Sequence, residues 1–301
     1  MTNAVIVIGE GMIEVAERPE SGWHLGYGGD TLNTAIHLAR SGLAVRFASA
    51  IGSDPLSARL RSDWEAAGLD CSLVLADPVR EPGLYAITRD AEGERNFAYW
   101  RGQSAARHLF EHPDSTRLAE EAGRAELLCF SLISLAVLPD AGREALLDIA
   151  AQVRAQGGRV AFDGNYRPRL WSSAEQAETW RTRAAGVADI GLPTLSDETM
   201  LSGLETADAV ASTWEQAGCG EVVVKLGADG CRMRDGRIAP VPRKLRAFDT
   251  SGAGDAFNGG YLSGRMRGLD PAAAAARGQA LAGWVVMRAG AIPPRDDEAP
   301  Y

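Results

Sequence analysis

The stretch Asp249-Thr250-Ser251-Gly252-Ala253-Gly254-Asp255 constrains the fold and chemistry of this chain more than any other. Its small residues Gly252 to Gly254 let the backbone turn tightly before a helix, where free N–H groups and the helix dipole attract an anion. An aspartate at this point repels a bound phosphate, and it makes sense if Asp255 takes a proton from an attacking hydroxyl. The alternative is an ordinary glycine-rich turn that Asp255 caps.

Composition and charge indicate a globular cytoplasmic protein. The 301 residues are 46% hydrophobic and 24% charged, which allows a sizeable core. A formal charge of −9 disfavours a nucleic-acid partner, although a few placed arginines still allow small anionic ligands. We expect no export signal and no membrane association, because the N-terminus has no basic leader and no apolar stretch approaches roughly 20 residues. The four cysteines lack CxxC spacing, as in a reducing compartment.

Buried strands and amphipathic helices alternate along the chain, which favours an α/β fold with a mainly parallel sheet covered on both faces. The strands are short apolar runs bounded by Gly, Asp or Glu, and we predict them at Val5–Ile8, Leu127–Phe130, Val160–Phe162 and Val222–Val224. The helices include residues 31–41, 57–67, 142–156 and 173–188.

Two segments break this alternation and predict a small β lid over the ligand edge of the sheet. Residues 13–27 look irregular, with a proline and a glycine inside. Residues 83–101 predict a hairpin, with strands at Leu84–Arg89 and Arg95–Arg101 and a turn through Asp90–Glu94. Because no repeat or long linker occurs, we expect a single domain over 1–301, with lid segments at roughly 10–30 and 80–103.

The run at 249–255 resembles the DT-x-GAGD signature of the PfkB or ribokinase-like carbohydrate kinases. That resemblance implies a three-layer α/β/α ribokinase-like fold with a small β-sheet lid. It also implies that Asp255 is the catalytic base and that Gly252, Ala253 and Gly254 form the anion hole. ATP and Mg²⁺ are the implied cofactors, and a requirement for a monovalent cation is left open.

A second stretch, Gly28-Gly29-Asp30-Thr31-Leu32-Asn33, resembles the GG-x-x-x-N segment of the same family. By itself it is typical of a turn followed by an Asp N-cap. The resemblance implies instead that Gly29, Asp30 and Asn33 contact the sugar. Order and separation of the two motifs also match the family, so the resemblance covers nearly the whole chain.

The nucleotide contacts implied by the resemblance come from a strand and loop at 224–230, which is similar to the family's K-x-G-x-x-G. They are Lys225, Gly227, Ala228 and Gly230, together with Gly252 and Gly254 of the anion hole. The sequence has no Gly-Lys-Ser/Thr of a Walker A loop and no GxGxxG after a strand, which disfavours a P-loop or dinucleotide enzyme.

The chain departs from the family's N-x-x-E, a motif linked to magnesium and phosphate. Thr194 stands at the Asn position and Asp197 at the Glu position, with Glu198 next to it. Carboxylates suit the hard Mg²⁺ ion, so we expect Asp197 or Glu198 to hold it through water.

Two arginines at the ligand edge favour an acidic sugar, because guanidinium groups pair best with carboxylates. They lie in Tyr99-Trp100-Arg101 and in the run from Asp163 to Trp171, and both segments resemble 2-keto-3-deoxygluconate kinases. This likeness implies that substrate is held by Tyr85, Tyr99, Arg101 and Arg167 beside Asp255, with Asn165 and Arg167 near the phosphates.

We therefore expect an ATP-dependent kinase that phosphorylates the terminal hydroxyl of 2-keto-3-deoxygluconate to give its 6-phosphate. One alternative is a kinase for a neutral sugar, of fructokinase or ribokinase type. Another is a non-catalytic regulator that binds sugar or nucleotide. The expected partners are a sugar acid and ATP, and, since lids in this family often pair between subunits, other copies of the same chain.

Overall fold

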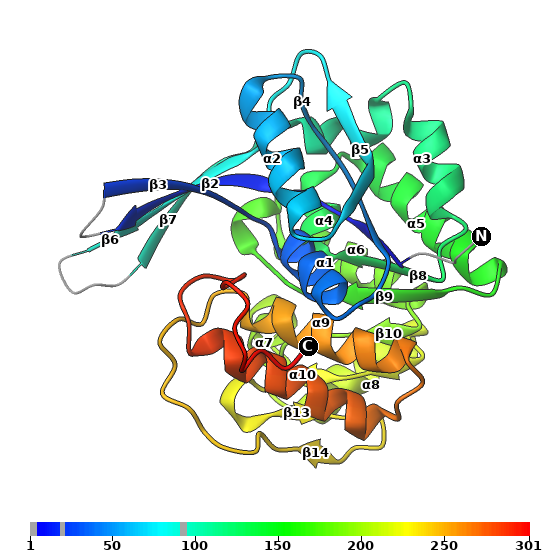
Figure 1. The fold of residues 1–301 in the computed structure, drawn as a ribbon. Helices are drawn as coiled ribbons and strands as arrows, with labels where there is room; N and C mark the ends of the chain where they lie inside the picture. Colours follow the sequence, from blue (N-terminus) through cyan, green and yellow to red (C-terminus); the bar gives the residue numbers. More distant parts are fainter. Residues whose placement is uncertain (1–4, 19–21, 91–94) are drawn as a thin grey trace.

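A seven-stranded parallel sheet forms the centre of the computed structural model, which describes residues 5–18, 22–90 and 95–301 (Figure 1). Its strand order is β11-β10-β9-β8-β1-β4-β5. The strands are β1 Val5–Ile8, β4 Val45–Gly52, β5 Asp70–Asp77, β8 Leu127–Ser131, β9 Arg159–Asp163, β10 Ile190–Gly191 and β11 Glu221–Val222. The parallel order confirms the α/β fold predicted from the alternation of strands and helices.

Helices cover both faces of this sheet. Side chains alternate between the faces along each strand, so the apolar strands present apolar side chains on both sides. Val5 and Val7 pack with α1 Asp30–Arg40, α2 Pro55–Ala66, α9 Ala253–Met266 and α10 Pro271–Val286. Ile6 and Ile8 pack on the other face, against helices that include α3 Ser115–Ala122, α4 Leu132–Val137, α5 Asp140–Ala155, α6 Ala174–Gly186, α7 Leu195–Ser202 and α8 Ala207–Ala217. Three short 3₁₀ turns complete the helices described here: η1 Ala105–Glu111, η2 Pro168–Leu170 and η3 Gly227–Asp229. None of the helices in the described part of the chain is both long and apolar enough to cross a bilayer.

Helix starts follow local capping chemistry. The Asp54 carboxylate accepts the N–H groups of Leu56 and Ser57 at the start of α2. Asp270 caps α10 in the same way, and a proline occupies the first position of each helix. Proline fits there because the first helical N–H has no partner within the helix.

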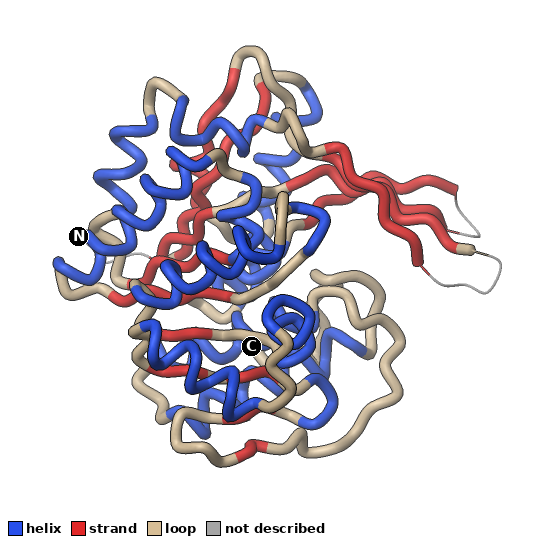
Figure 2. Tube along the Cα trace, turned by 180° about the vertical axis from the view of Figure 1, so that it is seen from behind, coloured by secondary structure: helices blue, strands red, loops and turns tan. Residues whose placement is uncertain are grey.

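A separate four-stranded sheet projects from one side of the body (Figures 1 and 2). Its order is β3-β2-β6-β7, from β2 Met12–Arg18, β3 Gly22–Gly28, β6 Leu84–Arg89 and β7 Arg95–Trp100. The predicted irregular segment at 13–27 was wrong, because β2 and β3 pair in register from Met12–Gly28 to Arg18–Gly22. The missing signal was tertiary: β2 also pairs with β6, some seventy residues later in the chain. Residues 91–94 of the expected turn and Pro19 lie outside the described residues.

The predicted strand at 222–224 is divided between two sheets, which corrects the prediction. Val222 ends β11, whereas Val224 begins β12 Val224–Lys225 in a small antiparallel sheet with β13 Cys231–Arg232 and β14 Ile238–Ala239. The neighbouring strand β10 ends just before Pro193, whose ring nitrogen cannot donate to the ladder. Pairing nevertheless continues past this point, because the N–H groups of Val223 and Lys225 donate to the carbonyls of Gly191 and Pro193, which keeps Lys225 at the ligand edge.

Trp214 of α8 provides a test of this packing. Its side chain is fully buried and stacks on Phe162 of β9. Trp214→Ala should lower the free energy of unfolding by about 3–5 kcal/mol, since a large cavity opens in the core. Chemical denaturation measures this, with Met200→Ala of α7, whose side chain is 62% exposed, as the control; equal effects in both variants would contradict the assigned core.

Candidate active site

The candidate site lies where several parallel strands end, the edge at which open α/β sheets bind ligands. Glu10 follows β1, Asp163 ends β9, and Lys225 ends β12. Helix α9 meets Asp163 and Lys225 at this edge, because both bond to Asn258 of that helix. The sheet and α9 therefore build one polar cluster from distant parts of the chain.

The glycine-rich turn adopts a shape that only glycine tolerates easily. Gly252 is the N-cap of α9 with φ of 67°, in the left-handed region. A side chain there would also collide with Ala291. No side chain caps α9, and Asp255 lies within its first turn, so the capping role considered for Asp255 is not found. The N–H group of Ala253, one of the expected anion-hole amides, donates to the Thr250 carbonyl at 3.3 Å.

Asp255 is buried and bonded on one side by an amide from α1. Asn33 Nδ2 donates to its Oδ2 at 2.8 Å, and the Thr34 hydroxyl reaches its backbone carbonyl at 3.4 Å. Burial raises the pKa of Asp255 to about 8, and the nearby Asp30 carboxylate adds to the rise. A carboxyl group tuned in this way can exchange a proton near neutral pH.

Asp30 begins α1 next to the base. Gly29 is the N-cap, its φ is 151°, and a side chain on it would strike the carbonyl of Glu10. Asn165 Nδ2 donates to Asp30 Oδ2 at 3.3 Å. Burial raises the pKa of Asp30 as well. The structure thus brings together Gly29, Asp30, Asn33 and Asp255, which belong to two separate sequence motifs.

Lys225 is held by two residues that the sequence reasoning did not single out. Its Nζ lies 2.9 Å from Asp163 Oδ1 and 3.1 Å from Asn258 Oδ1, while Asn258 Nδ2 donates to Asp163 Oδ2 at 2.8 Å. All three side chains are buried. Nζ is also 3.7 Å from where a Cβ on Gly254 would be. The helical spacing could have identified Asn258. Residues three or four apart lie on one helix face, and Asn258 comes three residues after Asp255 and four after Gly254.

The loop after Lys225 links β12 to β13 and carries the other expected nucleotide contacts. Gly227 and Gly230 have φ of 59° and 102°, and a side chain on Gly230 would strike the carbonyl of Ala239. Gly227 and Ala228 are exposed, so their backbone is accessible to a ligand.

Arg167, just after β9, and Asp197, in the first turn of α7, face each other. Arg167 precedes η2, its side chain is 53% exposed, and its Nη1 lies 3.4 Å from Asp197 Oδ2. Burial raises the pKa of Asp197, while Arg167 opposes the rise. This long contact leaves most of the guanidinium group available to an anion.

Glu198 lies beside Asp197 in α7 but turns into the core. Its side chain is fully buried, Trp214 Nε1 donates to Oε1 at 3.0 Å, and Arg181 Nε lies 3.7 Å from Oε2. A magnesium role for Glu198 therefore requires a different side-chain position from the one seen here. Asp197 is the carboxylate of the two that is partly accessible.

Two tyrosines lie side by side on the projecting sheet. Tyr85 of β6 and Tyr99 of β7 are register partners, with ring centroids 5.8 Å apart. The Tyr85 hydroxyl donates to Glu14 Oε2 at 2.5 Å, and it lies where a side chain on Gly28 would be. Glu14 was missed by the sequence reasoning because its strand β2 was not predicted.

Arg101 follows β7 and forms an ion pair with Glu10. The Arg101 side chain is 11% exposed and that of Glu10 is 2% exposed. Glu10 precedes β2 and Arg101 follows β7, so the ion pair links the two chain segments at the base of the projecting sheet. Arg101 was expected to hold the substrate, and Glu10 was not singled out.

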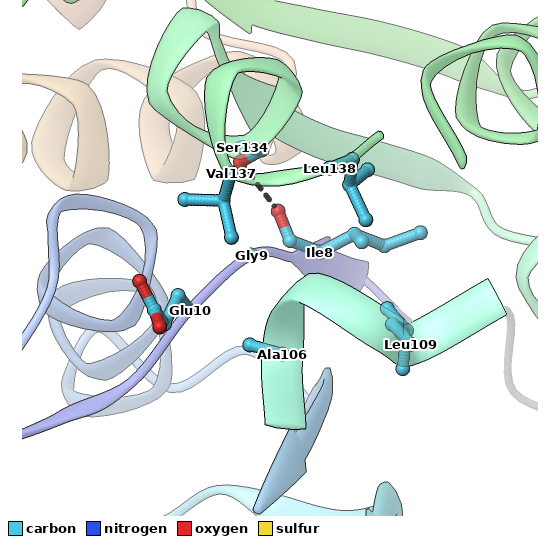
Figure 3. A pocket seen from close by; sticks show the side chains of 8 residues that line it. All are labelled: Ile8, Gly9, Glu10, Ala106, Leu109, Ser134, Val137 and Leu138. Atoms are coloured by element: carbon cyan, nitrogen blue, oxygen red, sulfur yellow. Dashed lines mark hydrogen bonds between the residues drawn. The ribbon is translucent and has the colours of Figure 1, made fainter. Parts of the chain in front are cut away.

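A small pocket lies behind Glu10 (Figure 3). Apart from Glu10 and Ser134 its lining is apolar, and Ser134 Oγ donates to the Ile8 carbonyl at 2.9 Å. It contains none of the residues around Asp255, and we assign it no ligand. The remaining lining residues are Gly9, Ala106, Leu109, Val137 and Leu138.

A buried carboxyl group beside an anion-attracting helix N-terminus is the chemistry of an enzyme that transfers a phosphoryl group to a hydroxyl. Residues 2–298 match a family model described as "pfkB family carbohydrate kinase". This chain belongs to that family, which implies ATP and a divalent metal ion.

Curated and solved relatives extend over almost all of the chain. It is 40% identical to 2-dehydro-3-deoxygluconokinase of Escherichia coli K12, covering 98% of this chain and 99% of that protein. The enzyme of the same name from Dickeya dadantii is 39% identical, with 97% of each chain covered. The structure of Salmonella enterica aminoimidazole riboside kinase, complexed with aminoimidazole riboside and an ATP analog, matches with a TM-score of 0.81 and 26% identity. That match covers 96% of this chain and 95% of the other, and the ribokinase-like fold is confirmed.

The pKa of Asp255 predicts a pH dependence. If Asp255 acts as a base it must lose its proton, so kcat/KM should fall as the pH drops below about 8. Asp30→Asn removes a neighbouring negative charge, so the pH at which the rate falls should move lower. A pH series of initial rates measures both effects, and an acidic limb unmoved by Asp30→Asn would contradict the assigned coupling.

Proposed function

We propose that this protein is an ATP-dependent 2-keto-3-deoxygluconate kinase that forms the 6-phosphate. The observation that carries the proposal is the full-length similarity to kinases of that name, at 40% identity in the Escherichia coli case. The buried Asp255 at the start of α9 supports it with the required chemistry. An intact base also favours an active kinase over a silent regulator.

In the proposed reaction, Asp255 removes the proton of the 6-hydroxyl of the sugar acid. The oxygen then forms a bond to the γ-phosphorus, the bond from that phosphorus to the bridging oxygen breaks, and ADP leaves. The amides of Gly252, Ala253 and Gly254 stabilise the transferring group, and Lys225 adds positive charge nearby. Asn33 orients the base through the bond at 2.8 Å.

Asp197 is the residue that we propose to hold Mg²⁺ through water. Its partly accessible carboxylate suits a hard, hydrated cation, and it lies beside Arg167 at the nucleotide side. Bound Mg²⁺ would neutralise charge on the phosphates. Glu198 stays a weaker candidate because it is engaged by Arg181 and Trp214. We propose no monovalent-cation site from these contacts.

For the sugar acid, we propose that Arg167 pairs with the carboxylate, together with the donors of Arg101 that its ion pair with Glu10 does not use, while Tyr85 and Tyr99 cover the sugar from the lid. Gly29, Asp30 and Asn33 meet the hydroxyls. ATP lies along Lys225 and the loop of Gly227, Ala228 and Gly230, with Gly252 and Gly254 at its terminal phosphate. Asn165 and Arg167 lie at the junction of the two substrates, since Asn165 already contacts Asp30.

The chain is proposed to work as one domain over 1–301, with lid segments at 10–30 and 80–103, and as a homo-oligomer. The projecting sheet supports the proposal of a homo-oligomer, because several large apolar side chains on it are exposed. They are Trp23, Leu25, Phe97, Tyr99 and Trp100. We propose a reducing cytoplasmic setting, which the four free, buried cysteines support.

Coupled ATP turnover tests the substrate. We expect kcat/KM for 2-keto-3-deoxygluconate to exceed that for fructose, ribose or gluconate by at least about 10³, because a site built for a charged group rejects substrates that lack it or misplace it. A preference for fructose or ribose would favour the neutral-sugar alternative.

Arg167→Ala should lower the preference for 2-keto-3-deoxygluconate by about 10- to 100-fold, as for a lost charged hydrogen bond, while the exposed neighbour Arg169→Ala should not.

Replacement of the base tests the mechanism. Asp255→Asn should lower kcat by about 10²- to 10⁴-fold and leave the unfolding midpoint intact, since only the proton acceptor is lost. Asp235→Asn is a matched control, because its side chain is 47% exposed and pairs with the exposed Arg237. A near-normal rate in Asp255→Asn would reject the assigned base.

A further inference from the structure

His37 of α1 is a buried histidine to which the proposed mechanism gives no role. Its ring is fully buried, with Nε2 3.0 Å from the Ala291 carbonyl and Nδ1 2.8 Å from the Tyr301 hydroxyl. A carbonyl oxygen only accepts, so Nε2 carries the proton and Nδ1 accepts from Tyr301. Burial lowers the pKa of His37 to about 4, which keeps the ring neutral with a single N–H.

The carbonyl that His37 holds belongs to the residue packed against the glycine-rich turn. A side chain on Gly252 would collide with Ala291, and the Ala291 oxygen lies 3.2 Å from that position. A second link joins the same two segments, because Asp249 accepts the N–H groups of Ser251 and Gly290, each at 2.8 Å. Residues 290–291 therefore form the outer support of the turn.

One face of α1 contacts both residues 290–291 and the base Asp255. Asn33 and His37 are four residues apart and so share a helix face, and Asn33 donates to Asp255. Arg40, three residues further on, donates from Nη1 to the Pro293 carbonyl at 2.8 Å. The segment that follows α10 returns to α1 and α9 (red in Figure 1), and the Tyr301 ring stacks on His37 with centroids 6.0 Å apart.

We propose that His37 is a positioning residue for phosphoryl transfer, which holds Ala291 against Gly252 through its Nε2–H while Tyr301 selects the protonated nitrogen. α1 then sets the distance between the base and the amides that receive the phosphoryl group. This inference rests on the proposed assignment of Gly252–Gly254 as the anion hole. Because transfer depends on placed donors, a shift of the turn should reduce kcat and leave the KM of the sugar unchanged.

Two substitutions of similar size separate the hydrogen bond from the packing. His37→Gln keeps an N–H near the position of Nε2, whereas His37→Leu fills the space without a donor. We expect His37→Leu to lower kcat roughly 10- to 100-fold, the cost of a small misplacement, and His37→Gln to retain most of the wild-type rate. Tyr301→Phe should give a smaller loss, because the ring stays packed and only the hydroxyl is removed.

Tyr261→Phe is the matched control for these variants. It removes a buried hydroxyl from α9 that bonds to Glu221 at 2.6 Å, two turns beyond the glycine-rich turn. It should change the unfolding midpoint and leave kcat unaffected. If His37→Leu fails to fold, Tyr301→Phe and His37→Gln carry the comparison.

A wild-type kcat in His37→Leu, or in Tyr301→Phe when His37→Leu does not fold, would overturn the inference. So would an equal loss in the Gln and Leu variants. The proposed site is tested separately by Asp255→Asn. An inactive Asp255→Asn enzyme beside an undamaged His37→Leu enzyme would reject only the positioning role, while an active Asp255→Asn enzyme would reject the site itself.

Discussion

The site depends on one buried ammonium group, that of Lys225. It lies between Asp163 at 2.9 Å and Asn258 at 3.1 Å, and Asn258 closes the triangle by donating to Asp163. A buried charge pair is tolerable only when it is also fully hydrogen-bonded. Because its members come from β9, β12 and α9, the triangle holds the start of α9 at the carboxyl edge of the sheet.

That arrangement leaves Asp255 without an ion pair to any of the residues that the structure describes. Lys225 lowers the pKa of Asp255 less than burial and Asp30 raise it. The carboxyl group is thus poised near neutral pH, which suits a base that must bind and release a proton in each cycle. Two further contacts order the lid: Glu10 pairs with Arg101 at its base, and Tyr85 donates to Glu14 within it. Each contact includes one residue that we propose to meet the sugar, Arg101 in the first and Tyr85 in the second.

Much of the fold and part of the site could be predicted because the signals are local. The apolar run at 5–8 alternates its side chains between two packed layers, and the glycine at 252 is required by its own left-handed backbone. Within the expected lid segments at 10–30 and 80–103, the hairpin from β6 and β7 was predicted, but the strands β2 and β3 were not. Short strands without an apolar partner nearby become stable only when a distant strand pairs with them.

The sequence by itself determined the alternating strands and helices, the glycine-rich turn and the family. Tertiary structure decided which side chains meet. Asn33 reaches Asp255 across 222 positions, and His37 reaches Tyr301 across 264. It also separated two adjacent carboxylates, placing Asp197 beside the exposed Arg167 and Glu198 against Arg181. The physical reason is that backbone preference and hydrophobic period act over a few residues, whereas the pairing of buried charges depends on how whole layers pack.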